Sequence, residues 1–174
     1  MKKALVVMGV AGCGKSSLAR AIANARQWRL IEGDDFHSTT NREKMSKGIA
    51  LTDEDRSDWL NALGLEIQKY PEGAVLACSA LKKSYRDRLR SYSADLHFAF
   101  LEIEKVEAQQ RVEARAATHF FSASLVDTQF ATLEIPLGEP NVIGLNATER
   151  LDVLVNQVMQ WLERPQPNRS SAWV

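Results

Sequence analysis

Residues 9–16 read Gly9-Val10-Ala11-Gly12-Cys13-Gly14-Lys15-Ser16. They fit the pattern Gly-x-x-x-x-Gly-Lys-Ser, and they lie between an apolar run, 4–8, and an alanine-rich segment, 16–26, that is typical of a helix. Glycines let backbone amides approach an anion closely, and the start of the helix adds positive potential there. We therefore expect all eight residues to bind the phosphates of a nucleotide, with the Lys15 ammonium on the β- and γ-phosphates and the Ser16 hydroxyl on Mg²⁺.

Cys13 is the unusual member of this loop. The N-terminus of a helix can lower the pKa of a thiol, which would open Cys13 to oxidation. The alternative, which we prefer, is a small residue that only fills its position in the loop.

Short apolar runs alternate with amphipathic segments along the rest of the chain. Strands are expected at 4–8, 30–32, 74–78, 97–101 and 141–145. Helices are expected at 16–26, 41–47, 53–70 (capped by Thr52), 81–91, 105–115, 125–133 and 148–162 (capped by Thr148). This alternation predicts an α/β fold of three layers, a five-stranded parallel sheet with helices on both faces, whose ligands bind beyond the carboxyl ends of the strands.

Length and charge restrict the class of protein. The chain has 174 residues, which favours one domain over 1–174, with a loosely ordered tail at about 163–174. Its 22 basic and 22 acidic residues balance, which argues against a nucleic-acid partner. No apolar stretch approaches the ~20 residues of a membrane span, and the apolar run at 4–8 is too short for a signal peptide. We expect a cytoplasmic protein without a membrane partner.

The loop predicts a nucleotide but not a reaction. No Asn-Lys-x-Asp signature for guanine occurs, and the strand-end acid that holds Mg²⁺ in many ATPases has only a weak candidate, Glu102. Instead Asp34 and Asp35 follow the second expected strand, which should end near the phosphate loop. A carboxylate there could orient an acceptor hydroxyl and take its proton, and we expect Asp34 to do so. The alternative for two adjacent aspartates is a turn or a helix cap.

Several blocks of the sequence resemble the gluconate kinase family. They are Gly-Asp-Asp-Phe-His at 33–37, Asn-Arg-Glu-Lys-Met at 41–45, Leu-Thr-Asp-Glu-Asp-Arg at 51–56, Cys-Ser-Ala-Leu-Lys-Lys-Ser-Tyr-Arg-Asp at 78–87, His-Phe-Phe at 119–121, and Gln129-Phe130 with Leu133-Glu134. The resemblance implies a P-loop fold like that of nucleoside monophosphate kinases. It also implies a homodimer that uses ATP and Mg²⁺ to phosphorylate D-gluconate at its 6-hydroxyl, giving 6-phospho-D-gluconate.

The acceptor would be a small polyol with a carboxylate, which needs fixed cations and hydrogen-bonding groups. Arg56 and Arg86 can each bind a carboxylate in bidentate fashion, Lys82 adds a point charge, and His37 can bond a hydroxyl. Residues 82, 86 and 90 would share one helix face. The alternatives are a solvated basic face for Lys82 and Arg86, a salt bridge to neighbouring acids for Arg56, and loop packing for His37.

The expected lid, at about 116–124, departs from the family pattern. The family usually has Arg, a variable residue and then Gly-His-Phe, whereas here Arg115 precedes Ala-Ala-Thr-His-Phe, with Thr118 in place of the glycine. Lid arginines in related kinases stabilise charge on the transferred phosphoryl group, so Arg111 and Arg115 are our candidates. The resemblance adds His119 to the substrate-binding residues. Asp58 replaces a proline that the family often has, a change that a helix should tolerate.

Two other functions fit the loop. One is a kinase for another small hydroxy acid such as shikimate, whose family shares the loop and an aspartate after the second strand. The other is a nucleotide-binding regulator without transfer activity. The cations expected on the acceptor side and the missing guanine signature argue against a regulator.

Overall fold

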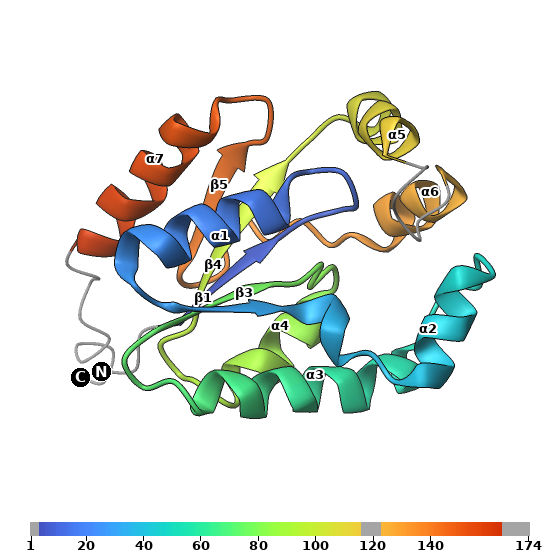
Figure 1. Ribbon diagram of the computed structural model, residues 1–174, viewed down its shortest axis with the longest axis horizontal. Helices are drawn as coiled ribbons and strands as arrows, with labels where there is room; N and C mark the ends of the chain where they lie inside the picture. The colour runs from blue at the N-terminus through green and yellow to red at the C-terminus, as the bar shows by residue number, and fades with distance from the viewer. Residues whose placement is uncertain (1–3, 116–122, 165–174) are drawn as a thin grey trace, which may run out of the picture.

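The computed structural model of the chain describes residues 4–115 and 123–164, and a parallel sheet of five strands forms their centre (Figure 1). The strands are β1 Ala4–Met8, β2 Arg29–Glu32, β3 Ala74–Ala77, β4 His97–Glu102 and β5 Val142–Asn146. Their order in the sheet is β2-β3-β1-β4-β5, and all four pairings are parallel. The predicted fold class and all five predicted strands are confirmed.

Helices cover both faces of the sheet, which gives the three expected layers. They are α1 Lys15–Arg26, α2 Thr39–Ser46, α3 Asp53–Gln68, α4 Lys83–Arg90, α5 Lys105–Ala114, α6 Ala123–Thr132 and α7 Leu151–Glu163, with a short 3₁₀ helix, η1, at Gly33–Phe36. Helices α1 and α7 lie on one face, and α3 and α4 lie on the other (Figure 1).

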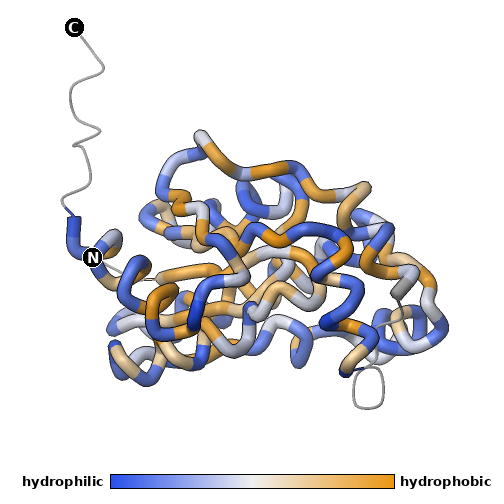
Figure 2. Tube along the Cα trace, turned by 90° about the horizontal axis from the view of Figure 1, so that it is seen from above, coloured by the Kyte–Doolittle hydropathy of each residue, from blue (hydrophilic) through white to orange (hydrophobic). Residues whose placement is uncertain are grey.

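Strand β1 divides the core into two halves. All five of its residues are buried. Because side chains alternate along a strand, Leu5 and Val7 pack with the α1 and α7 side, whereas Val6 and Met8 pack with the α3 and α4 side. Seen from above, hydrophobic stretches follow the central strands, and hydrophilic and hydrophobic residues alternate along the surrounding helices (Figure 2). Within the described ranges, no helix combines the length and apolar character needed to cross a membrane.

The two predicted caps have different outcomes. Thr52 caps α3 as expected: its hydroxyl accepts the Asp55 amide N–H, and the Asp55 carboxylate accepts the Thr52 amide N–H in return. The prediction for Thr148 is wrong, because α7 begins at Leu151. The Asn146 side-chain oxygen accepts both the amide and the hydroxyl of Thr148, at 3.0 and 2.8 Å, and this turn delays the start of the helix. Asp58 lies on α3, as the sequence predicted.

The Asp55 carboxylate should make the fold sensitive to acid. Hydrogen bonds, foremost from Lys44, lower its pKa from 3.8 to about 2. A lowered carboxyl pKa stabilises the folded state above the unfolded pKa, and this contribution is lost as pH falls from about 4 towards 2. We expect Asp55→Asn to lower Tm near neutral pH, with a deficit that shrinks as the pH approaches 3. Thermal unfolding followed by circular dichroism, at pH values from about 7 down to about 3, measures this difference in Tm.

Asp58→Asn is the matched control, because the Asp58 carboxylate lies on the same helix and is exposed. Its Tm should follow that of the unaltered protein at every pH. A deficit for Asp55→Asn that stays constant with pH would contradict the assignment.

Candidate active site

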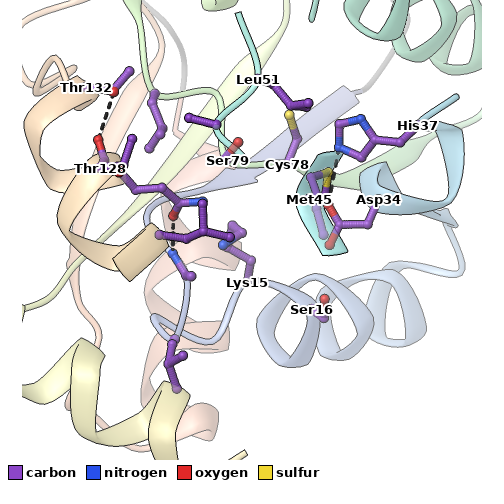
Figure 3. A pocket seen from close by; sticks show the side chains of 18 of the residues that line it. Lys15, Ser16, Asp34, His37, Met45, Leu51, Cys78, Ser79, Thr128 and Thr132 are labelled. Carbon is purple, nitrogen blue, oxygen red and sulfur yellow. Dashed lines mark hydrogen bonds and ion pairs between the residues drawn. The ribbon is translucent and has the colours of Figure 1, made fainter. Parts of the chain in front are cut away.

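The three segments expected at the ligand site meet in one cavity. Strands β1, β3 and β2 are neighbours, so the residues after their carboxyl ends lie side by side. A cavity of about 250 Å³ opens there. Its lining includes Lys15 and Ser16 after β1, Asp34 and His37 after β2, and Cys78 and Ser79 after β3 (Figure 3). The topology therefore positions this site, as predicted.

The phosphate loop turns sharply between β1 and α1. Gly12 and Gly14 have φ values of 82° and 95°, in the left-handed region that favours glycine. A Cβ atom on Gly12 would also lie 2.8 Å from the Ala108 carbonyl oxygen. The Lys15 ammonium donates to the Val10 carbonyl at 3.0 Å, so this side chain curls across the loop.

Cys13 packs inside the loop. It is buried, and a Cβ atom on Gly9 would lie 2.8 Å from its sulfur. Desolvation by burial raises the pKa of the Cys13 thiol and outweighs the positive charge of Lys15. The geometry therefore favours the preferred interpretation, a small residue that fills its position in the loop, over a thiol of lowered pKa.

Glu32 faces Ser16 in the cavity, and the sequence analysis missed it. The Ser16 hydroxyl donates to Glu32 Oε2 at 2.8 Å. Glu32 Oε1 is buried without a hydrogen bond from any described residue, and the Arg20 guanidinium is 3.8 Å away. An anionic oxygen beside a hydroxyl suits a hard cation, so these two residues fit Mg²⁺. The signal that could have found Glu32 is its place as the last residue of β2, two residues before Asp34.

Asp34 and His37 form the acceptor-side wall. Asp34 lies in η1 with 70% of its side chain exposed, and one carboxylate oxygen is 3.9 Å from His37 Nε2. The His37 ring stacks on Trp59 with centroids 4.3 Å apart, and Trp59 donates to the Gly33 carbonyl at 2.8 Å. Burial lowers the pKa of His37, which favours the neutral imidazole, and its buried Nδ1 has no hydrogen bond among the described residues.

Arg56 is the predicted acceptor cation that reaches the cavity. It lines the wall, and its guanidinium donates to the Leu51 carbonyl and, at 3.5 Å, to the Tyr85 hydroxyl. The Tyr85 hydroxyl in turn donates to Asp53. Among the described residues, no neighbouring carboxylate forms a salt bridge with Arg56, so the alternative of a salt bridge does not hold.

The prediction that Arg86 binds substrate is wrong. The Arg86 side chain is fully buried, and all five of its N–H groups are used. It donates to the carbonyls of Ala80, Leu81 and Glu134 at 2.8–3.0 Å and forms a bidentate ion pair with Glu139, with Nη2 and Oε1 2.6 Å apart. A saturated, buried guanidinium has no donor left for a ligand. Arg86 instead holds the loop after α6 against α4.

Lys82 also does not reach the cavity. It precedes α4 as the N-cap residue, and its ammonium binds both carboxylate oxygens of Asp53, at 2.8 and 3.0 Å. The predicted common face therefore holds only for Arg86 and Arg90, which both bind Glu139. Spacing alone did not show that Lys82 lies before the helix.

The two candidate lid arginines separate. Arg115, the C-cap residue of α5, lines the cavity, as its role requires. Arg111 bonds Glu107 at 3.0 Å and the Ala147 carbonyl at 3.3 Å, and the structure does not bring it to the cavity. His119, and with it 116–122 of the expected lid, lies outside the described residues.

Helix α6 completes the lining from the other side. Gln129 accepts the Ala11 backbone N–H of the phosphate loop through Oε1 at 2.6 Å. Sequence reasoning noticed Gln129 only as part of the family resemblance and gave it no role. Its contact joins residues 118 positions apart, which no local pattern predicts.

Arg86→Met should destabilise the fold by about 3–5 kcal/mol, because it leaves the largely buried Glu139 carboxylate with Arg90 alone and removes the donor from three backbone carbonyls. Urea unfolding measures the loss. Lys83→Met, on the exposed side of the same helix, removes only the ion pair with Asp87 and should cost less than about 1 kcal/mol. Equal stability of the two variants would contradict the structural role of Arg86.

Comparisons with known proteins agree with this geometry. The family model described as an AAA domain matches residues 5–136. A gluconokinase of Gluconobacter oxydans is 40% identical over 90% of this chain and 89% of its own length. The thermoresistant gluconokinase of Escherichia coli is 37% identical over 91% of this chain and 93% of its own. The crystal structure of a gluconokinase from Sinorhizobium meliloti matches with a TM-score of 0.84 and 42% identity, over 92% of this chain and 91% of that one. The chain therefore belongs to the gluconokinase family of P-loop kinases.

Proposed function

We propose that this chain transfers the γ-phosphoryl group of ATP to the 6-hydroxyl of D-gluconate, giving 6-phospho-D-gluconate and ADP. One observation carries the proposal: the phosphate loop and the group Asp34, His37 and Arg56 face one another across a single cavity. The gluconokinases that resemble the chain support the choice of acceptor.

On the donor side, the amides of residues 9–16 and the Lys15 ammonium bind the β- and γ-phosphates. Ser16 and Glu32 are the residues that would hold Mg²⁺, which supplies positive charge against the phosphate oxygens when bound. Their hydrogen bond of 2.8 Å keeps the two oxygen ligands together.

On the acceptor side, Asp34 orients the 6-hydroxyl and accepts its proton. As the new bond from this oxygen to the γ-phosphorus forms, the bond to the bridging oxygen of ADP breaks. Neutral His37 accepts or donates one hydrogen bond with a sugar hydroxyl, and Arg56 binds the carboxylate. Tyr85, which is itself bonded to Asp53, orients the Arg56 side chain. Lys82 holds the Asp53 carboxylate, so Lys82 affects the substrate site only indirectly.

Arg115 is our candidate for the charge that develops on the transferred group, because it lies on the cavity wall beside the phosphate loop. Closure of the expected lid, 116–124, would exclude water and limit hydrolysis of ATP. A role for His119 in substrate binding, one domain over 1–174 with a loose tail, a homodimer and a cytoplasmic location stay predictions from the sequence.

The test is a coupled assay of ADP release with gluconate, shikimate, nucleosides or no acceptor. Release that depends on gluconate supports the proposal, and release that depends on shikimate favours a kinase for another hydroxy acid. ATP turnover without an acceptor would contradict the proposal and indicate a hydrolase. Nucleotide binding without turnover would contradict it and indicate a regulator.

Asp34→Asn should lower kcat about 10²-fold or more, because the general base is lost while its shape remains. The Kd for ATP, measured by titration calorimetry, should change little. Asp35→Asn is the matched control: Asp35 does not line the cavity, and its backbone oxygen, which accepts from Arg42 at 2.9 Å, is unchanged. Full turnover by Asp34→Asn would exclude the base assignment.

Arg56→Lys should raise KM for gluconate about tenfold or more and lower kcat less, because an ammonium cannot make the bidentate contact. Arg88→Lys, on an exposed arginine that donates to Ser57, is the control and should keep both constants. An unchanged KM in Arg56→Lys would assign the carboxylate to another cation.

A further inference from the structure

Helix α6 presents three polar side chains to the cavity, as far as the described residues go. Leu125, Thr128, Gln129 and Thr132 line the cavity from this helix. Both threonine hydroxyls donate to carbonyls of their own helix: Thr128 donates to Ser124 at 3.3 Å. Thr132 donates to Thr128 at 2.8 Å, the bond that Figure 3 draws. Among the described residues, the carboxamide of Gln129 is therefore the α6 side chain on the cavity that keeps an N–H donor for a ligand.

Of the two polar atoms of the Gln129 carboxamide, only the oxygen has a hydrogen-bond partner among the described residues. Its oxygen accepts the Ala11 N–H at 2.6 Å. Its nitrogen, Nε2, has no hydrogen-bond partner among the described residues, although the residue is half-buried on the cavity wall. An amide nitrogen with two N–H groups is a donor only, so it suits an oxygen of a ligand and not a cation.

The position of Ala11 indicates which ligand oxygen is near. Val10, the preceding residue, accepts a hydrogen bond from the Lys15 ammonium at 3.0 Å. The lysine of this loop motif reaches the β- and γ-phosphates. The Gln129 carboxamide is thus held beside the end of the loop where the terminal phosphate of ATP is expected.

The fold fixes the end of α6 that carries Gln129. The Glu134 amide donates to the Leu81 carbonyl at 2.9 Å, and the Glu134 carboxylate accepts the Lys83 amide at 2.7 Å. The Glu134 carbonyl accepts a bond from buried Arg86 at 3.0 Å. Gln129 lies just over one helical turn before this anchor, so its position is set before any ligand binds.

We propose that Gln129 is a γ-phosphate-binding residue: Oε1 holds the Ala11 amide, and Nε2 donates a hydrogen bond to a γ-phosphoryl oxygen of ATP. The proposal rests on the proposed function only in placing ATP on the loop. Because ADP lacks the γ-phosphoryl group, Gln129 distinguishes the two nucleotides and also helps to hold the group during transfer.

The experiment compares Kd values for ADP and for the non-hydrolysable analogue AMPPNP, both with Mg²⁺, by titration calorimetry. Gln129→Met should bind AMPPNP about tenfold more weakly, the usual scale for a hydrogen bond to a charged group, and ADP within about twofold of the unaltered protein. Gln129→Glu keeps an oxygen for the Ala11 amide but places negative charge against the phosphate. It should weaken AMPPNP more than Gln129→Met does, and it serves as the second variant if Gln129→Met does not fold.

Gln109→Met is the matched control. Gln109 lies on α5 and donates to Asp127 of α6 at 3.0 Å, so its loss loosens the contact between the helices without touching the cavity. Its two Kd values should not change. Equal weakening of ADP and AMPPNP by the Gln129 variants, or no weakening of AMPPNP, would overturn the proposal. Neither readout needs gluconate, so the result is independent of the acceptor.

Discussion

The burial of β1 on both faces is the constraint on which the site depends. Because β1 pairs with β3 on one side and β4 on the other, its end is fixed at the middle of the sheet. The chain can leave this position only through a tight turn, and positive φ values at Gly12 and Gly14 allow that turn to enter α1. The amides of the loop are thus aimed by the packing of Leu5, Val6 and Val7 rather than by a ligand.

The order of the strands then decides which residues can share the cavity. Strand β3 lies between β1 and β2, so the residues after β3 separate the phosphate loop from Asp34 by about one strand spacing on each side. Trp59 from α3 stacks on His37 and bonds Gly33, which ties the acceptor wall to the core on the opposite face of the sheet. Donor and acceptor walls are therefore connected through the sheet and its core.

Local patterns in the sequence sufficed for the fold and for the loop. Strand β1 was predicted to the residue, and Thr52 could be predicted as a cap because three acidic residues, 53–55, follow it in the first turn of the helix. Arg86 and Lys82 could not be placed in this way. Their partners, Glu139 and Asp53, lie 53 and 29 residues away in the sequence, and a positive charge does not show whether it faces solvent, a ligand or a buried carboxylate. Glu32 was missed because its role depends on the turn that brings Ser16 beside it.

The same long-range partners explain how the two walls keep their spacing. Arg86 holds Glu134 and Glu139, so the segment after α6 is bound to α4, which follows β3 on the acceptor side. Through Gln129, helix α6 itself holds the Ala11 amide on the donor side. A buried ion pair is costly to desolvate, and here Arg86 also satisfies two backbone carbonyls, of Ala80 and Leu81, that would otherwise lack this donor. The arginine that the sequence assigned to the substrate thus acts on the site through the helix that it anchors, and its saturation leaves Arg56 as the acceptor-side arginine that lines the cavity among the described residues.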